Sequence, residues 1–187
     1  MSRANEAKPW FPKHYADTVQ RMRVPAGIVL ALALVLLATP TRASLYISIP
    51  FAVIGLGIRA WAAGHLAKNE DLASSGPYAL VRNPLYLGTL IAAIGLAIAS
   101  TTLAVFVLVA VVFLLVYFPV IEQEEAHLRQ LFPKFADYAE RVAMLIPSQP
   151  LAGPLTGFRG KLYLRNQEYK ALIAFALAFA FLWWRSL

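Results

Sequence analysis

The sequence has no cysteine and little charge, and both absences narrow what the protein can be. Without thiols there is no disulfide framework, no thiolate metal site and no cysteine nucleophile. Only 14% of the 187 residues are charged, whereas soluble domains carry about 25%. No glycine-rich phosphate-binding loop follows a strand-like segment, which excludes a soluble Rossmann-type domain. The histidines and acidic residues lack the spacing of a zinc or iron centre, so we expect no metal.

What the sequence does contain is hydrophobic residues, 59% of the total, arranged in long blocks. A helix crosses a bilayer with about 20 apolar residues, or with ~17 when flanking side chains reach the interface. Five runs approach this length: Val24–Thr39, Ser44–Gly64, Pro84–Ala99, Leu103–Ile121 and Ala171–Trp184. The pattern predicts an all-α fold, a polytopic helical membrane protein with about five transmembrane helices.

We expect a single membrane domain over residues 1–187. Residues 1–23 form a cytoplasmic leader, and residues 24–121 form four spans that include a polar motif at 76–88. Residues 122–168 form a cytoplasmic cap segment, and residues 169–187 form the fifth span. In the cap segment, Glu122–Leu131 continues the fourth helix, and Glu125 and Arg129 have the i,i+4 spacing of an ion pair.

The net charge of +7 indicates how the chain crosses the membrane. Fifteen of the 17 Lys and Arg residues fall before the first span, around the second loop or between the fourth and fifth spans. Only Arg42 and Arg185 fall on the other side. Positive charge concentrates in cytoplasmic loops, so we predict a cytoplasmic N-terminus and a site that faces the cytoplasm. Because the charges lie at span ends rather than in a basic domain, we expect no nucleic-acid partner.

Two polar clusters stand beside the apolar runs, and polar groups at membrane depth tend to mark a functional site. Asn83-Pro84 is a helix-start signature, with Asn capping and Pro at the first helical position. The segment 100–102 is a tight turn. About 25 Å of helix separates it from Asn83 and about 33 Å separates it from Glu124. The turn therefore brings two clusters to one depth: Arg82, Asn83 and Tyr86 with Glu122–Glu125.

These motifs resemble the isoprenylcysteine carboxyl methyltransferase family, whose pattern related phospholipid methyltransferases share more loosely. The first motif is Gly76-Pro77-Tyr78, then Arg82-Asn83-Pro84-Leu85-Tyr86 and Gly88, and the second is Glu124-Glu125 with Leu128 and Phe132. Together they cover roughly Arg59–Pro147, about half of the chain. The resemblance implies an integral membrane enzyme that uses S-adenosylmethionine.

Carried over residue by residue, the resemblance implies a cofactor pocket and a catalytic group. The pocket would comprise the loop before the motif, the motif itself and one carboxylate: Glu70, Asp71, Leu72, Ala73, Tyr78, Asn83, Pro84, Leu85, Tyr86 and Glu124. The catalytic group would be Arg82, Asn83 and Glu125. The sulfonium and ammonium groups of the cofactor are cationic and need a protein carboxylate as partner. The carboxylate of the cofactor needs hydrogen-bond donors from the protein. The prediction is a cofactor pocket on the cytoplasmic face.

This chain departs from the family pattern at two positions that bear on the substrate. Asn83 stands where the family has His, and Asn cannot titrate near neutrality, which excludes a protonated imidazole at that point. Val120 stands where isoprenylcysteine enzymes have the Arg that handles the substrate carboxylate. Both departures argue against a prenylcysteine substrate more than they argue against methyl transfer.

The predicted function is therefore methyl transfer to an amphipathic or lipid-like acceptor that enters from the bilayer. A prenylated thioether lipid and a phospholipid amine are both open as acceptors, and so is the oligomeric state. Two alternatives remain: an NADPH-dependent sterol-type membrane reductase and a non-catalytic membrane subunit. Binding of S-adenosylmethionine separates both alternatives from the methyltransferase.

Overall fold

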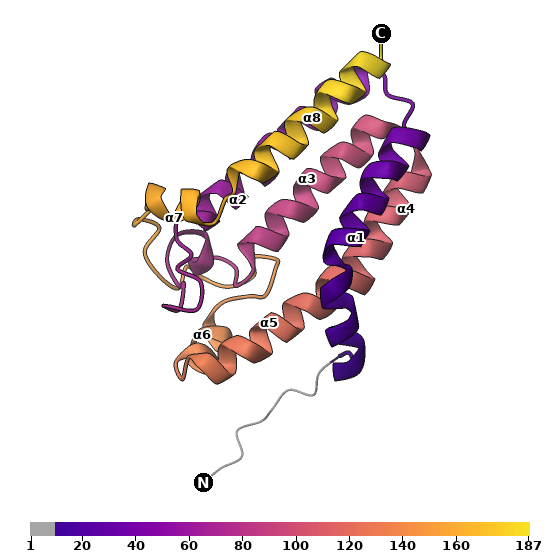
Figure 1. Ribbon diagram of the computed structural model, residues 1–187. Coiled ribbons are helices and arrows are strands. Elements are labelled where there is room, and N and C mark those ends of the chain that lie inside the picture. Colours follow the sequence, from indigo (N-terminus) through magenta and orange to yellow (C-terminus); the bar gives the residue numbers. More distant parts are fainter. Residues whose placement is uncertain (1–9) are drawn as a thin grey trace.

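The computed structural model describes residues 10–187, and this part of the chain folds into helices without a β-strand, which confirms the all-α prediction (Figure 1). The long helices are α1 (Lys13–Leu37), α2 (Arg42–Ala63), α3 (Pro84–Ser100), α4 (Leu103–Val112), α5 (Phe118–Leu131) and α8 (Tyr169–Arg185). The short ones are η1 (Gly76–Ala79), α6 (Phe135–Arg141) and α7 (Gly160–Arg165), and a π-helical turn, η2 (Phe113–Tyr117), joins α4 to α5.

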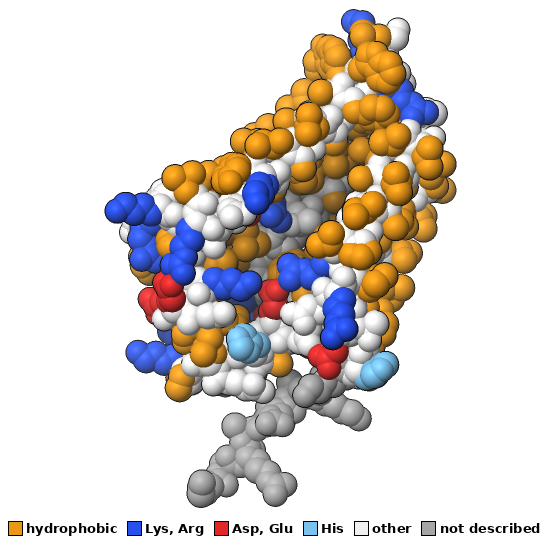
Figure 2. Space-filling model, viewed as in Figure 1, with side chains coloured by type: hydrophobic (Ala, Val, Ile, Leu, Met, Phe, Trp, Pro, Cys, Tyr) orange, Lys and Arg blue, Asp and Glu red, His pale blue; other side chains and the backbone are white. Residues whose placement is uncertain are grey.

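In the part of the chain that the structure describes, three helices are long and apolar enough to cross a membrane: His14–Leu37, Arg42–Ala63 and Leu103–Leu131. The apolar helix α3 is shorter, with 17 residues. Figure 2 shows hydrophobic side chains over the long helices, while most charged side chains gather at the end of the molecule that holds α5, α6 and α7. The chain is a helical membrane protein, and the count of five spans stays a prediction.

Helices α2 and α3 pack closely because glycines face each other across their contact. A Cβ atom added to Gly55 would lie 2.6 Å from the carbonyl oxygen of Gly88, and one added to Gly88 would lie 2.5 Å from that of Gly55. Helix α8 lies along α2, whereas α1 lies beside α4 and α5 (Figure 1). Pro50 lies within α2 and does not end it.

The predicted tight turn between the third and fourth apolar helices is confirmed. Thr101 adopts the left-handed conformation with φ of 56°, and α4 starts two residues later. The backbone N–H of Thr39 donates to the Ser100 carbonyl at 2.9 Å, so the α1–α2 connection closes over the turn. Helices α3 and α4 therefore leave one point and run back toward the other end of the bundle.

The π-helical turn η2 precedes Pro119, which has no N–H to donate to the carbonyl of Leu115. The hydroxyl of Tyr15 in α1 donates to that carbonyl at 2.7 Å and so satisfies it. Helix continues through η2 and α5 to Leu131, which confirms that Glu122–Leu131 extends the fourth apolar helix.

The predicted leader is helical from Lys13 onward and packs against α5, while its first nine residues lie outside the described part. The backbone N–H groups of Trp10 and Phe11 donate to the Glu122 carboxylate at 2.6 and 3.2 Å. These bonds fix the start of α1 beside the polar end of α5. From residue 10 onward, the leader is thus part of the helical bundle.

Candidate functional site

The centre of the site is an ion pair between Arg82, just before α3, and Glu125 of α5. The guanidinium donates to both carboxylate oxygens, at 2.8 Å from Nε and 2.9 Å from Nη2. Its Nη1 donates to the carbonyl oxygens of Ala139 and Val142, each at 2.7 Å. Both side chains are buried, with exposed fractions of 12% and 8%. This arrangement ties the first motif to α5, to α6 and to the segment after α6.

Asn83 joins the same cluster through its side-chain amide. Its Nδ2 donates to the Glu125 carboxylate at 2.7 Å and to the Met144 carbonyl at 3.3 Å. Asn83 does occupy the N-cap position of α3, and Pro84 follows at the first helical position, but the Asn side chain does not cap the helix. The predicted capping bond is wrong because the buried carboxylate of Glu125 takes the amide.

Glu125 and Arg129 have the i,i+4 spacing of an ion pair, but the structure does not pair them. Glu125 faces Arg82, and Arg129 instead places its guanidinium 5.3 Å from the centre of the Phe135 ring. A buried carboxylate needs a partner inside the protein, whereas Arg129 is exposed on the outer side of α5. The inference that the turn brings Asn83 and the glutamates to one depth is confirmed by their contact.

Glu124 forms a second and more open cluster. Its carboxylate accepts a hydrogen bond from the Tyr86 hydroxyl at 2.9 Å and one from Nη1 of Arg23 at 3.0 Å. The Arg23 guanidinium also lies over the Tyr86 ring, 5.5 Å from its centre. The side chains of Arg23 and Glu124 are each 38% exposed. Sequence reasoning used Arg23 only as a topology signal, because nothing in the sequence pairs α1 with α5.

Aromatic rings surround this open cluster. Tyr117, at the end of the π-helical turn, makes an edge contact with Tyr86 at 5.9 Å and stacks on Phe113 at 6.0 Å. Val120 is fully buried in the same apolar group. Val120 occupies the position at which isoprenylcysteine enzymes resemble one another in having Arg. In this protein that position is packed among apolar side chains.

Within residues 10–187, the loop predicted to supply backbone contacts makes no hydrogen bond to Glu124 or Glu125. Glu70 pairs with Arg165 at the surface, Asp71 is exposed, and Leu72 packs against the apolar cluster of Phe135, Tyr138 and Val142. Ala73 is half-buried, and so is Leu85, whose carbonyl accepts from Arg59 at 3.3 Å. Within residues 10–187, no hydrogen bond joins the segment 70–73 to Glu124 or Tyr86.

Tyr78 lies between these regions and is buried. Its carbonyl accepts a hydrogen bond from the Tyr138 hydroxyl at 2.7 Å. Burial raises the pKa of the Tyr78 phenol, and the nearby Tyr138, Glu124 and Glu168 raise it further. The Tyr78 hydroxyl is therefore protonated at neutral pH and can only donate or accept hydrogen bonds as a neutral group.

Two further buried polar groups were not assigned to the site from the sequence. Arg59 of α2 pairs with Glu168 at the start of α8 and also donates to Thr89 of α3. His65 shares a 3.0 Å hydrogen bond with Ser75, and burial together with the nearby Arg159 lowers the pKa of its imidazole. Both groups brace the helices and loops that flank the motif.

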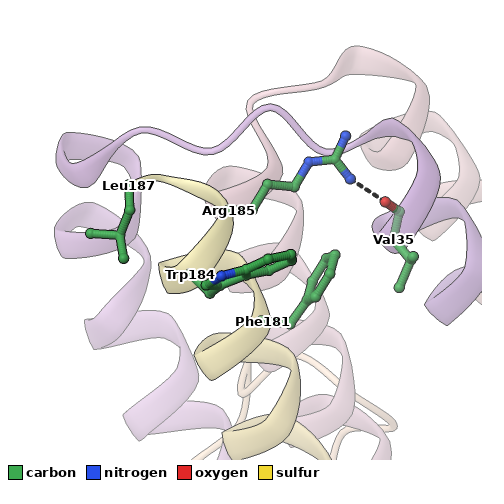
Figure 3. Close-up of a pocket in the computed structure, with 5 residues that line it drawn as sticks. All are labelled: Val35, Phe181, Trp184, Arg185 and Leu187. Carbon is green, nitrogen blue, oxygen red and sulfur yellow. Dashed lines mark hydrogen bonds between the residues drawn. The ribbon is translucent and has the colours of Figure 1, made fainter.

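An open, mostly apolar pocket lies at the opposite end of the bundle. It has a volume of 630 Å³ and is lined by Val35, Phe181, Trp184, Arg185 and Leu187 (Figure 3). Arg185 donates there to the carbonyl oxygen of Val35 near the end of α1. This end adjoins the Thr39–Ser100 contact, so the length of α3, about 25 Å, separates the cavity from Glu124. The cavity is not part of the candidate site.

Comparison of the sequence with known proteins identifies relatives of the chain. The chain is 38% identical over 103 residues to the cobalt-zinc-cadmium resistance protein CzcN of Cupriavidus metallidurans, covering 54% of this chain and 46% of that protein. It is 31% identical over 103 residues to the nickel-cobalt-cadmium resistance protein NccN of Alcaligenes xylosoxydans xylosoxydans, covering 54% and 47%. The matched region spans about half the length of these curated relatives. No solved structure matches the chain.

The family model for phospholipid methyltransferases matches residues 26–134. That range includes α2, α3, α4 and α5, and with them Arg82, Asn83, Tyr86, Glu124 and Glu125. The chain therefore belongs to the phospholipid methyltransferase family.

Proposed function

We propose that this protein is a membrane methyltransferase that uses S-adenosylmethionine and methylates a lipid-like acceptor. The observation that carries the proposal is the open cluster of Glu124 and Tyr86 next to the buried cluster of Arg82, Asn83 and Glu125. In the open cluster, the partly exposed carboxylate of Glu124 is accessible to a ligand, and Tyr86 is buried beneath it. The buried cluster fixes the helices that carry these two residues. Membership of the phospholipid methyltransferase family supports the same reaction class.

The residues of the open cluster fit the cofactor. When bound, S-adenosylmethionine supplies an activated methyl group on a cationic sulfonium, beside a cationic ammonium. The partly exposed carboxylate of Glu124 is a suitable partner for such charge. The ring of the partly buried Tyr117 adds a face that attracts cations, whereas Arg23 already lies over the ring of Tyr86. The remaining predicted wall residues are Glu70, Asp71, Leu72, Ala73, Tyr78, Pro84 and Leu85, and they stay proposals for the adenosine side.

The buried cluster has a different role in this proposal. Sequence reasoning placed Arg82, Asn83 and Glu125 in catalysis, and the hydrogen bonds of the three side chains are directed at each other and at the backbone. We therefore infer that they position Tyr86 and Glu124, which touch the ligand. Methyl transfer depends on orientation and exclusion of water, so a rigid support for the binding residues contributes directly to the rate.

The acceptor we propose is a phospholipid amine or a similar lipophilic amine. Val120 is buried among apolar side chains, so the position that would serve a prenylcysteine carboxylate carries no charge. An amine must lose a proton before it attacks the methyl group. Glu124 is paired with Arg23 and, in this proposal, with the cofactor's ammonium, so the base we propose is a water beside the open cluster. We further propose that this end of the bundle faces the cytoplasm, as the charge distribution predicts.

The relatives' names concern metal resistance, and we do not extend a metal site to this chain. Within residues 10–187, no group of three or more His, Asp or Glu side chains is placed to hold a metal ion. About half of each relative lies outside the region that matches this chain. The methyltransferase proposal rests on the family and on the geometry around Glu124.

The test is calorimetric binding of S-adenosylhomocysteine to the detergent-purified protein, with NADPH as the competing ligand class. We expect micromolar binding of S-adenosylhomocysteine that is lost in Glu124→Ala and in Tyr86→Ala. The matched control is Glu140→Ala, which removes an exposed carboxylate from α6 and should bind like the wild type. Binding of NADPH alone would favour the reductase, and binding of neither ligand by a folded protein would overturn the proposal.

A further inference from the structure

Arg23 is a charged residue of the open cluster that no comparison assigns. It lies in α1, before the first residue of the matched family region. Its guanidinium contacts the Glu124 carboxylate at 3.0 Å and lies 5.5 Å from the centre of the Tyr86 ring. The residue thus reaches the two side chains that the proposed function places against the cofactor.

The donors of Arg23 are engaged very differently from those of Arg82. A guanidinium carries five N–H donors in a planar fork. Arg82 uses Nε, Nη1 and Nη2 in four hydrogen bonds to the Glu125 carboxylate and two backbone carbonyls. Within residues 10–187, Arg23 donates one hydrogen bond, to Glu124. With 38% of its side chain exposed, Arg23 can still bind an anion, and Arg82 cannot.

Contacts between α1 and α5 hold Arg23 at this position. Tyr15 donates to the Leu115 carbonyl, Gln123 donates to Asp17, and Val19 is buried in the same apolar cluster as Tyr86. Tyr15, Val19 and Arg23 follow one another at intervals of four residues, so they share the side of α1 that faces α4, η2 and α5. The guanidinium is therefore presented by a fixed helix rather than by a mobile loop.

We propose that Arg23 binds the α-carboxylate of the cofactor's methionyl group while Glu124 binds its ammonium. The inference rests on the proposed function and names a residue for it. An amino acid carries one positive and one negative group on a single carbon. Glu124 and Arg23 present the opposite charges side by side, 3.0 Å apart, which matches such a zwitterion. Arginine suits a carboxylate because its planar fork can bind both oxygens.

The test compares two ligands that differ only in the carboxylate. Binding of S-adenosylhomocysteine and of its decarboxylated analogue, which keeps the ammonium, is measured by calorimetry for the wild type, Arg23→Ala and Arg23→Lys. The control is Arg21→Ala, which removes an exposed arginine from the same helix. We expect the wild type and Arg21→Ala to prefer the carboxylate ligand by about tenfold or more, as a charge-assisted hydrogen bond provides.

In Arg23→Ala that preference should disappear, with both ligands binding about equally, and Arg23→Lys should keep part of it. An unchanged ratio of the two affinities in Arg23→Ala would overturn the role of Arg23, and so would an equal loss for both ligands. A wild type that binds neither ligand would overturn the proposed function instead. The two failures are therefore distinguishable.

Discussion

Glu124 and Glu125 are neighbours in the sequence, yet the structure places them in different environments. Glu125 is buried and shares its oxygens with Arg82 and Asn83, whereas Glu124 is partly exposed and contacts Arg23 and Tyr86. Successive residues of a helix point about 100° apart, so one turn of α5 presents one carboxylate to the protein interior and one to an open cluster.

Under the proposed function, this difference gives Glu125 a supporting role and Glu124 a ligand-binding role. The carboxylate of Glu125 already has donors on both oxygens, so exchange of a partner for a ligand would leave a buried charge uncompensated. The Glu124–Arg23 pair is partly exposed. A ligand can therefore replace either partner with only a small change in free energy. A stability measurement and a binding measurement should therefore rank the two glutamates in opposite order.

The largest effect on stability is expected for Glu125→Ala. The substitution leaves the Arg82 guanidinium buried beside Asn83 without its carboxylate, which costs about 3–5 kcal/mol in the free energy of unfolding. For a chain of this size that corresponds to a fall of about 6 °C or more in the thermal unfolding midpoint. The midpoint is measured in detergent, with Glu140→Ala as the exposed control. Equal midpoints for the two variants would contradict the structural role of Glu125.

An intermediate effect is expected for Glu168→Ala. Glu168 pairs with Arg59, and their side chains are 10% and 21% exposed, between the values of the other two pairs. Arg59 keeps the Leu85 carbonyl and Thr89 as acceptors when Glu168 is removed. We expect a loss of about 2 kcal/mol, between the values typical of exposed and buried pairs. If the thermal unfolding midpoint of Glu168→Ala lies below that of Glu125→Ala, the exposure of these ion pairs does not determine how much each contributes to stability.

The meeting of the two motifs was predictable because helix geometry alone fixes it. Ser100-Thr101-Thr102 is a recognisable turn, and the apolar runs on either side have lengths that bring Asn83 and the glutamates to one depth. The all-helical fold was predictable for a different reason. Long apolar runs in a bilayer must satisfy their backbone hydrogen-bonding groups internally, and a helix does so.

The partners of each side chain were not predictable, because they depend on contacts between helices that the sequence does not pair. The i,i+4 rule offered Arg129 for Glu125, but burial favoured Arg82, which comes from a different segment. Arg23 was unassigned because the packing of α1 on α5 depends on Val19, Tyr15 and the carbonyl freed before Pro119. Local spacing predicts elements, and packing decides which charges meet.

The smallest effect on stability is expected for Glu124→Ala, although the same variant should abolish cofactor binding. Its pair with Arg23 is 38% exposed on both sides, and such pairs contribute up to about 1 kcal/mol. The buried Tyr86 hydroxyl also loses its acceptor, so the unfolding midpoint should lie below that of Glu140→Ala but above those of Glu168→Ala and Glu125→Ala, while calorimetry detects no binding of S-adenosylhomocysteine. A double-mutant cycle of Arg23→Ala with Glu124→Ala should give a coupling in the unfolding free energy below about 1 kcal/mol. A larger coupling would place both glutamates in the supporting structure and remove the distinction between them.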